Sequence, residues 1–118
     1  MKSQMSLGEI ITTLRRKEPE KTVTYDFVHF RPQGIHSYRG YYEQLAIGYG
    51  HDDITVADLL ALCERAVGKT FTGYKGGDYV MSENTPVWVA NHNEAGGTAI
   101  VYVQDQDWRI VLITAAID

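Results

Sequence analysis

Two segments of the chain are best suited to holding a ligand, because each combines glycine and tyrosine with one basic side chain. The first segment, residues 73–77, reads Gly-Tyr-Lys-Gly-Gly. Glycine lets backbone N–H groups approach a ligand closely, Lys75 supplies a cation, and the ring of Tyr74 can stack on a nucleobase. The alternative for this segment is a glycine-rich turn that leads into a strand.

The second segment, residues 37–42, reads Ser-Tyr-Arg-Gly-Tyr-Tyr. A guanidinium fork grips phosphate through two parallel hydrogen bonds, and tyrosine rings stack on bases. Arg39 and Tyr41 are therefore candidates for the same kind of ligand. A surface loop with partly buried aromatic rings explains the segment equally well.

Trp88 lies in a predicted strand, residues 86–91, whose alternation places Val87 and Val89 on one face and Trp88 and Ala90 on the other. The indole either packs in the core or stacks on a ligand. Asn91, at the end of this strand, can read a base edge or shape a hairpin. The full set of candidate ligand-binding residues is Arg39, Tyr41, Tyr74, Lys75, Gly76, Tyr79, Trp88, Asn91 and Arg109.

The side chains that could serve in catalysis or metal binding do not have the sequence spacing of a known catalytic or metal-binding motif. The four histidines match no ligand motif such as H-E-x-x-H, and Asp52 or Asp53 is expected to cap the helix that follows. Cys63 falls on the apolar face of that helix, where we expect an inert packing thiol. We therefore predict no catalytic residue, no metal and no cofactor, and a protein that is not an enzyme.

Residues 68–70, Gly-Lys-Thr, look like the end of a phosphate-binding P-loop. The complete motif needs a glycine where Cys63 stands, and it opens a helix, whereas this segment closes one. We reject the motif, although Lys69 can still lie near an anion.

Two helices must help to position these residues. Residues 6–17 carry an apolar stripe at helical spacing, Ser6 and Glu9 have the spacing of a capping box, and Pro19 stops the helix. Residues 55–67 form the second helix, with Thr55 as N-cap and Gly68 at its C-terminal end. The expected buried face of the second helix consists of Val56, Leu59, Leu60, Cys63 and Val67.

The remaining elements are strands. The pattern predicts a turn at residues 31–34 and hairpin loops at 93–97 and 105–107. The predicted strands are residues 22–30, 41–49, 86–91, 98–104 and 108–116, of which 41–49 fits an irregular helix equally well. The prediction is an α+β fold in which residues 1–118 form a single ligand-binding domain, with a mainly antiparallel sheet flanked by two helices.

Composition narrows the classes of function. The chain has 118 residues, 44% of them hydrophobic, and a net charge of −4, which argues against a DNA-coating protein. We find no apolar run long enough for a membrane span and expect no signal peptide. A single cysteine fits a reducing compartment, so we expect a cytoplasmic protein without a membrane partner. Eight tyrosines and two tryptophans predict a homo-oligomer, at least a dimer.

The sequence resembles small phage and prophage proteins that we associate with the first type of Thoeris anti-defence protein. The resemblance spans roughly residues 7–114, and it rests on residues 37–42, 45–48 (Leu-Ala-Ile-Gly), 73–77 and 85–88 (Thr-Pro-Val-Trp). It implies a sponge that binds cyclic ADP-ribose isomers made by TIR-domain enzymes without cleaving them. It also implies ligand pockets between subunits of an oligomer, from dimer to hexamer, in the cytoplasm of the infected bacterium. Some members also bind CBASS cyclic trinucleotides at separate sites.

The candidate residues are compatible with such a ligand. Arg39, Lys75 and Arg109 can supply charge for a pyrophosphate, and Tyr41, Tyr74, Tyr79 and Trp88 can supply stacking. The main alternative is a phage protein that inhibits a host defence protein by direct binding, which the acidic charge would suit. A third possibility, an enzyme that hydrolyses a nucleotide, needs a metal or a general base that the histidine spacing does not supply.

Overall fold

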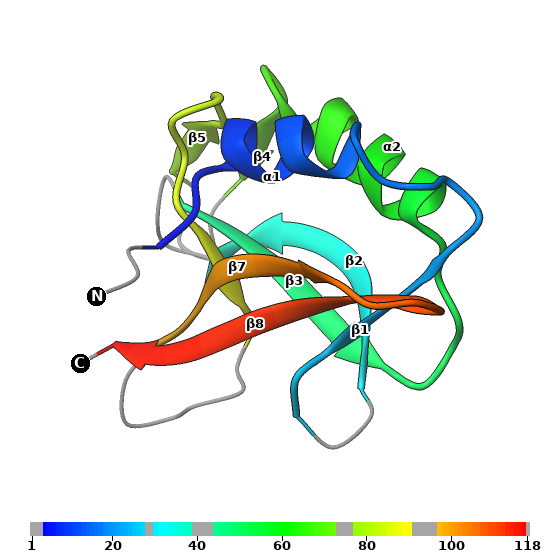
Figure 1. The fold of residues 1–118 in the computed structure, drawn as a ribbon. Coiled ribbons are helices and arrows are strands. Elements are labelled where there is room, and N and C mark those ends of the chain that lie inside the picture. Colours follow the sequence, from blue (N-terminus) through cyan, green and yellow to red (C-terminus); the bar gives the residue numbers. More distant parts are fainter. Residues whose placement is uncertain (1–3, 28–29, 39–43, 73–76, 91–96, 118) are drawn as a thin grey trace.

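Two helices lie across one face of a curved six-stranded sheet, and a separate two-stranded hairpin stands beside them (Figure 1). The structure is a computed structural model that describes residues 4–27, 30–38, 44–72, 77–90 and 97–117. The arrangement confirms the predicted α+β class with two helices.

The first helix, α1 (Leu7–Leu14), begins as the sequence predicts. The Ser6 hydroxyl accepts a hydrogen bond from the Glu9 N–H, and the Glu9 carboxylate accepts one from the Ser6 N–H. This capping box satisfies two of the donors that a helix start leaves free. The predicted end at residue 17 is wrong, because Arg15 is the C-cap and the chain turns there.

The second helix, α2 (Val56–Ala66), has Thr55 as its N-cap, and the Thr55 hydroxyl accepts from the Asp58 N–H. The expectation that Asp52 or Asp53 caps this helix is wrong. Asp53 instead forms an ion pair with Arg31, at 2.7 Å from Nε. Val67, predicted to be buried, is 37% exposed because the helix ends at Ala66, which is buried instead.

The main sheet has the order β1-β8-β7-β6-β3-β2. Three of its pairs are antiparallel, and β1·β8 and β3·β6 are parallel. The strands are β1 (Thr22–Tyr25), β2 (Arg31–Ser37), β3 (Leu45–Gly50), β6 (Val87–Val89), β7 (Gly97–Asp105) and β8 (Arg109–Ile117).

The largest error of sequence reasoning falls on β2, which occupies the segment predicted as a turn. Pro32 is tolerated because β2 is an edge strand, where one N–H can be missing without breaking the ladder. Gly34 adopts φ +69° at the point where the register with β3 shifts, so it makes a bulge rather than a turn. The strand predicted over residues 22–30 is also too long, since β1 stops at Tyr25.

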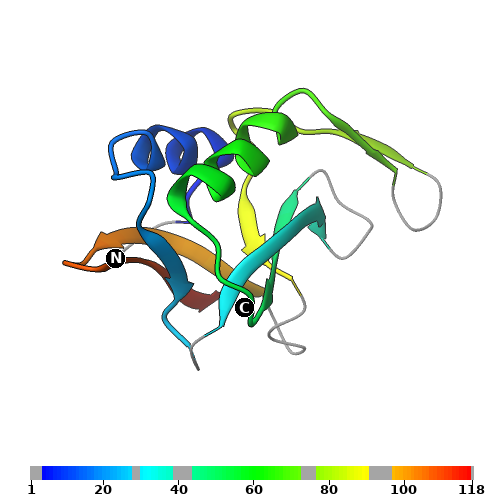
Figure 2. The same ribbon diagram turned by 90° about the vertical axis from the view of Figure 1, so that its right-hand side faces the viewer.

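Strands β4 (Thr70–Thr72) and β5 (Asp78–Val80) pair antiparallel in the hairpin, which extends away from the main sheet (Figure 2). Residues 73–77 connect these two paired strands in sequence. Residues 73–76 themselves lie outside the described residues.

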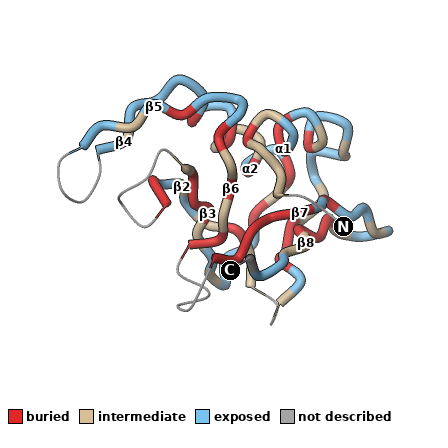
Figure 3. The backbone as a smooth tube through the Cα atoms, turned by 90° about the vertical axis from the view of Figure 1, so that its left-hand side faces the viewer, coloured by how far each residue is buried: buried red, intermediate tan, exposed pale blue. Residues whose placement is uncertain are grey.

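The core lies between the helices and the sheet, and buried positions follow β7 and the inner sides of α1 and α2 (Figure 3). Leu7, Ile10, Ile47, Leu59 and Ile100 are fully buried there. We call the opposite side of the sheet, which faces away from the helices, the outer face.

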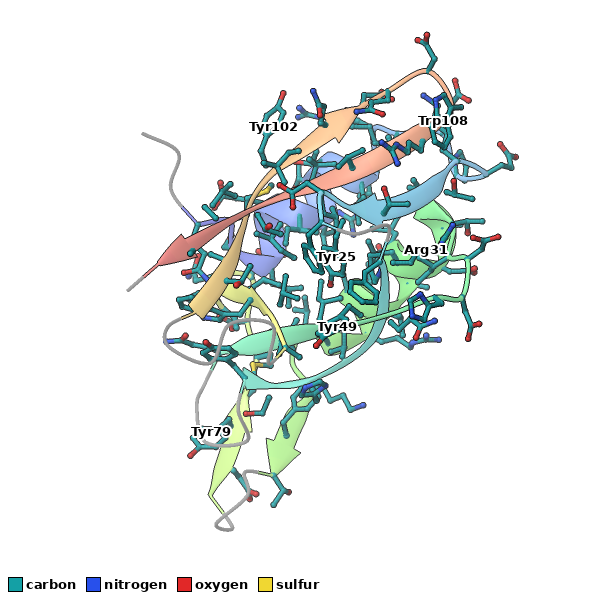
Figure 4. The ribbon with its side chains drawn as sticks, turned by 90° about the horizontal axis from the view of Figure 1, so that it is seen from below. Tyr25, Arg31, Tyr49, Tyr79, Tyr102 and Trp108 are labelled. Carbon is teal, nitrogen blue, oxygen red and sulfur yellow. The ribbon has the colours of Figure 1, made fainter. Side chains whose placement is uncertain are left out.

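Tyr25 connects β1, at one edge of the curved sheet, to β3, which lies next to the other edge. Its hydroxyl, at the end of β1, lies 2.8 Å from the Gly48 carbonyl and 3.1 Å from the Ile47 carbonyl, both in β3 (Figure 4). Strand β1 has no ladder with β3, so this side chain spans the inside of the fold. The edge of β1 that faces away from β8 contacts the segment before α2, where the Val23 N–H donates to the Ile54 carbonyl.

Replacing Tyr25 with phenylalanine removes this buried hydroxyl. We expect Tyr25→Phe to lower the free energy of unfolding by about 1–3 kcal/mol, because the Ile47 and Gly48 carbonyls each lose one hydrogen bond at the inside of the fold. Urea unfolding followed by circular dichroism measures the change. Tyr102→Phe is the matched control. Tyr102 is 49% exposed, so removal of its hydroxyl should change the free energy of unfolding by less than about 0.5 kcal/mol. Equal stabilities for the two variants would contradict the role given to Tyr25.

Candidate functional site

Two aromatic rings from distant parts of the chain stack on the outer face. Trp88 in β6 and Tyr38, which directly follows β2, have ring centroids 4.7 Å apart and an interplanar angle of 9°. The indole N–H of Trp88 donates to the side-chain oxygen of Gln44 at 2.5 Å. Ala46 and Ala90 pack against this pair, which we call the Tyr38–Trp88 stack.

Small residues make room for the indole. Strand register places Ala46 of β3 and Ala99 of β7 on either side of Trp88, and Ala115 of β8 lies beyond Ala99. A Cβ atom at Gly97 would overlap the six-membered ring of Trp88, so only glycine fits that position without movement. The predicted alternation is therefore confirmed, because Val87 and Val89 pack in the main core while Trp88 and Ala90 face outward.

Trp88 was predicted either to pack in the core or to stack on a ligand, and its environment matches neither alternative fully. The side chain is half-buried, with Tyr38 against its ring, so it is neither a core tryptophan nor an open platform. His36 of β2 continues the same row across Ala46. Desolvation lowers the pKa of His36 below its usual 6.5, so the imidazole at this edge of the stack is neutral at pH 7.

The chain leads from the stack into two of the segments that carry predicted ligand residues. Arg39 directly follows Tyr38, and Asn91 directly follows the buried Ala90. The stack thus brings together the starting points of two segments that begin 52 residues apart in sequence, at Arg39 and Asn91. Six of the nine predicted site residues lie outside the described residues, namely Arg39, Tyr41, Tyr74, Lys75, Gly76 and Asn91.

The other two predicted residues that the structure describes lie elsewhere. Tyr79 of β5 packs, half-buried, against the main core and not in the cluster around the stack. Arg109 begins β8, six residues before Ala115, which is about 20 Å along a strand. In Figure 4, Tyr79 and Trp108 lie at opposite ends of the molecule. One copy of the chain therefore does not bring Arg109 to Trp88.

Arg109 has partners of its own. Its Nε donates to the Gln106 side chain at 3.0 Å, and its guanidinium lies 4.6 Å from the ring centroid of Trp108. Nearby, Lys21 Nζ lies 2.8 Å from Asp105 Oδ1, and this hydrogen bond lowers the pKa of Asp105. These contacts fix the tip of the β7–β8 hairpin and leave Trp108 68% exposed.

Sequence reasoning missed an aromatic cluster around the turn after β1. Phe27 stacks on Tyr25 at 4.9 Å, and the ring of Phe30 lies 5.0 Å from those of both Tyr49 and His51. Tyr25, Phe27 and Phe30 all fall within the strand predicted over residues 22–30. The other rings could not be assigned because β2 was taken for a turn, which hid its register with β3.

Cys63 is confirmed as a packing residue, fully buried on the inner face of α2. Burial, with a smaller contribution from Glu64, raises the pKa of its thiol to about 12, so the thiol stays protonated at neutral pH. Over the described ranges, no group of three or more histidine, cysteine, aspartate and glutamate side chains is arranged to hold a metal ion. Among the helices of the described ranges, none is long and apolar enough to cross a membrane.

Comparisons with known protein families, curated proteins and solved structures find no match to this chain.

The buried thiol gives a direct test of the core. At pH 8 we expect a thiol reagent to leave Cys63 unmodified in folded protein and to label it rapidly in urea, because only the thiolate reacts and burial disfavours it. The same raised pKa means that stability contributed by the neutral thiol is lost as pH rises from about 9 towards 12. A spectrophotometric thiol assay measures the labelling, with Cys63→Ala as the blank. Fast labelling of folded protein would contradict this assignment.

The close approach of Gly97 to Trp88 gives a second test. We expect Gly97→Ala to lower the free energy of unfolding by about 1–3 kcal/mol, because the added methyl must displace the indole. In a Trp108→Phe background, where Trp88 is the remaining tryptophan, the emission maximum should move to longer wavelength. Trp108→Phe alone serves as the control and should be nearly neutral. Unchanged emission and stability in Gly97→Ala would show that the ring does not lie on Gly97.

Proposed function

We propose that the protein binds cyclic nucleotide immune signals beside the Tyr38–Trp88 stack and sequesters them without cleaving them. The observation that carries the proposal is the stack itself, from which the chain leads into the segments that hold Arg39, Tyr41 and Asn91. A guanidinium fork, an aromatic ring and an amide are the groups that phosphate, base and ribose require. The resemblance to Thoeris anti-defence proteins of the first type names cyclic ADP-ribose isomers as the first candidates.

The proposal includes a homo-oligomer. Nanomolar binding corresponds to about −12 kcal/mol, which requires a largely enclosed ligand. The stack lies on the outer face of the sheet, opposite the helices, so a second copy could complete the enclosure. Arg109, remote from Trp88 in its own chain, would then be available to a site on a neighbouring copy.

Direct inhibition of a host defence protein is the second candidate. Trp108 is 68% exposed and Tyr102 is 49% exposed, and both are visible from the outer side in Figure 4. Aromatic residues of this kind often supply the strongest contacts of protein interfaces.

One experiment separates these candidates. Purified protein is incubated with a panel of cyclic ADP-ribose isomers and cyclic trinucleotides, washed, and denatured by heat, and the released material is identified by mass spectrometry. Release of an intact ligand supports the sponge, and release of an altered ligand indicates an enzyme. If folded protein retains nothing from the panel, the sponge is excluded and protein binding becomes the leading candidate.

The charged residues give the quantitative prediction. We expect Arg39→Ala and Lys75→Ala each to weaken binding of the retained ligand by roughly 10- to 150-fold, the value of one charge-assisted contact to phosphate. Arg39→Lys should be almost as damaging, because an ammonium cannot reproduce a bidentate fork. Isothermal titration measures the affinities, with Arg16→Ala as control because Arg16 is exposed just after α1. Wild-type affinity in both alanine variants would exclude this site.

A further inference from the structure

A small cavity lies where the end of α2 meets β2 and β4, and its volume is about 80 Å³. Its apolar lining comes from all three elements, and its two remaining side chains are basic. The lining residues are Ile35, Leu62, Ala66 and Phe71, with Arg65 and Lys69. The cavity belongs neither to the Tyr38–Trp88 stack nor to any residue of the proposed nucleotide site.

Four basic side chains in the described part of this acidic protein form ion pairs. Arg15 pairs with Glu64, Arg31 pairs with Asp53, and Lys17 and Lys21 share Asp105. In the part of the chain that the structure describes, no carboxylate pairs with Arg65 or Lys69. Two uncompensated cations therefore border one apolar cavity.

Lys69 is held in place by the backbone around it. Its N–H donates to the Ala66 carbonyl and its carbonyl accepts from the Met81 N–H, both at 3.1 Å. The preceding Gly68, at φ +78°, makes the turn that ends α2. The ammonium lies 5.2 Å from the ring centroid of Phe71, on the cavity wall.

A structural role explains only part of this arrangement. Arg65 is in the last turn of α2, where a cation offsets the negative end of the helix dipole. That effect does not require a second cation just before β4, nor an apolar cavity beside the two cations. An apolar wall beside paired cations is the arrangement that suits an anion carrying an apolar body.

We propose that this cavity binds a small organic anion, with a phosphate or carboxylate head between Arg65 and Lys69 and a compact apolar body against Phe71 and Ile35. A cavity of about 80 Å³ takes a compact apolar group and excludes a whole nucleotide, so the anionic head stays at the rim beside the exposed side chains of Arg65 and Lys69. The proposal does not depend on the nucleotide site.

Phenyl phosphate and benzoate are suitable probes because both combine a ring with an anionic head. Inorganic phosphate lacks the ring, and phenol lacks the charge at neutral pH. In a titration followed by amide NMR, we expect both ring anions to shift the signals of Ala66 and Phe71, with at least about tenfold weaker binding of inorganic phosphate and of phenol. The stronger of the two ring anions identifies the preferred head group.

The variants test the two cations separately. Lys69→Gln and Arg65→Gln remove the charge and keep part of each aliphatic stem, and each should weaken binding of the preferred ring anion by about tenfold or more. Arg16→Gln removes an exposed arginine that lines no described part of this cavity and should leave the affinity unchanged. Equal loss in Arg16→Gln, equal binding of inorganic phosphate, or no shift at Ala66 and Phe71 with either ring anion would each overturn the proposal. Amide spectra of the free variants establish that they are folded.

Discussion

The buried hydroxyl of Tyr25 is the contact on which the arrangement of this fold depends. A six-stranded sheet with only two helices on one face would leave much of its inner surface wet if it stayed flat. Curvature brings β1 towards β3, and the hydroxyl bonds to two β3 carbonyls at that point. Strand β3 in turn carries β6 beside it in parallel, so the position of Trp88 follows from the same closure. Burial raises the pKa of Tyr25 well above 10, which keeps the hydroxyl a donor.

The two faces of the sheet serve different purposes because strand side chains alternate. The inner face is filled by branched aliphatic residues and supports the helices. The outer face carries alanine and glycine around one large indole, a combination that a plain hydrophobic core does not require. Tyr38 and Gln44 then fix the ring through a stack and a hydrogen bond. The rigid pair forms the base from which both neighbouring segments begin.

The helices were predictable because their signals are local. Ser6 with Glu9, and Thr55 at the second start, lie within one turn of the residues that they cap. Strand β2 was not predictable, because proline and glycine have the same local meaning in a turn and in a bulged edge strand. The contact between Tyr38 and Trp88 depends on β2, β3 and β6 lying side by side, and no local pattern encodes that order. Trp88 and Arg109 were both chosen as candidates from the chemistry of their side chains alone. The sheet places Arg109 far from Trp88.

The pairing of β1 with β8 has a consequence for synthesis of the protein. Thr22 lies beside Arg109 and Tyr25 beside Leu112, so the first strand has its ladder partner almost at the other end of the chain. On the ribosome, β1 leaves the exit tunnel long before β8 is made. Until then Tyr25 and its neighbours have no sheet to join, and apolar side chains of the early segments stay exposed. Contacts of such large sequence separation also slow folding itself, because the intervening loop must close first. The first strand can therefore complete its pairing only at the end of synthesis, when the last strand becomes available.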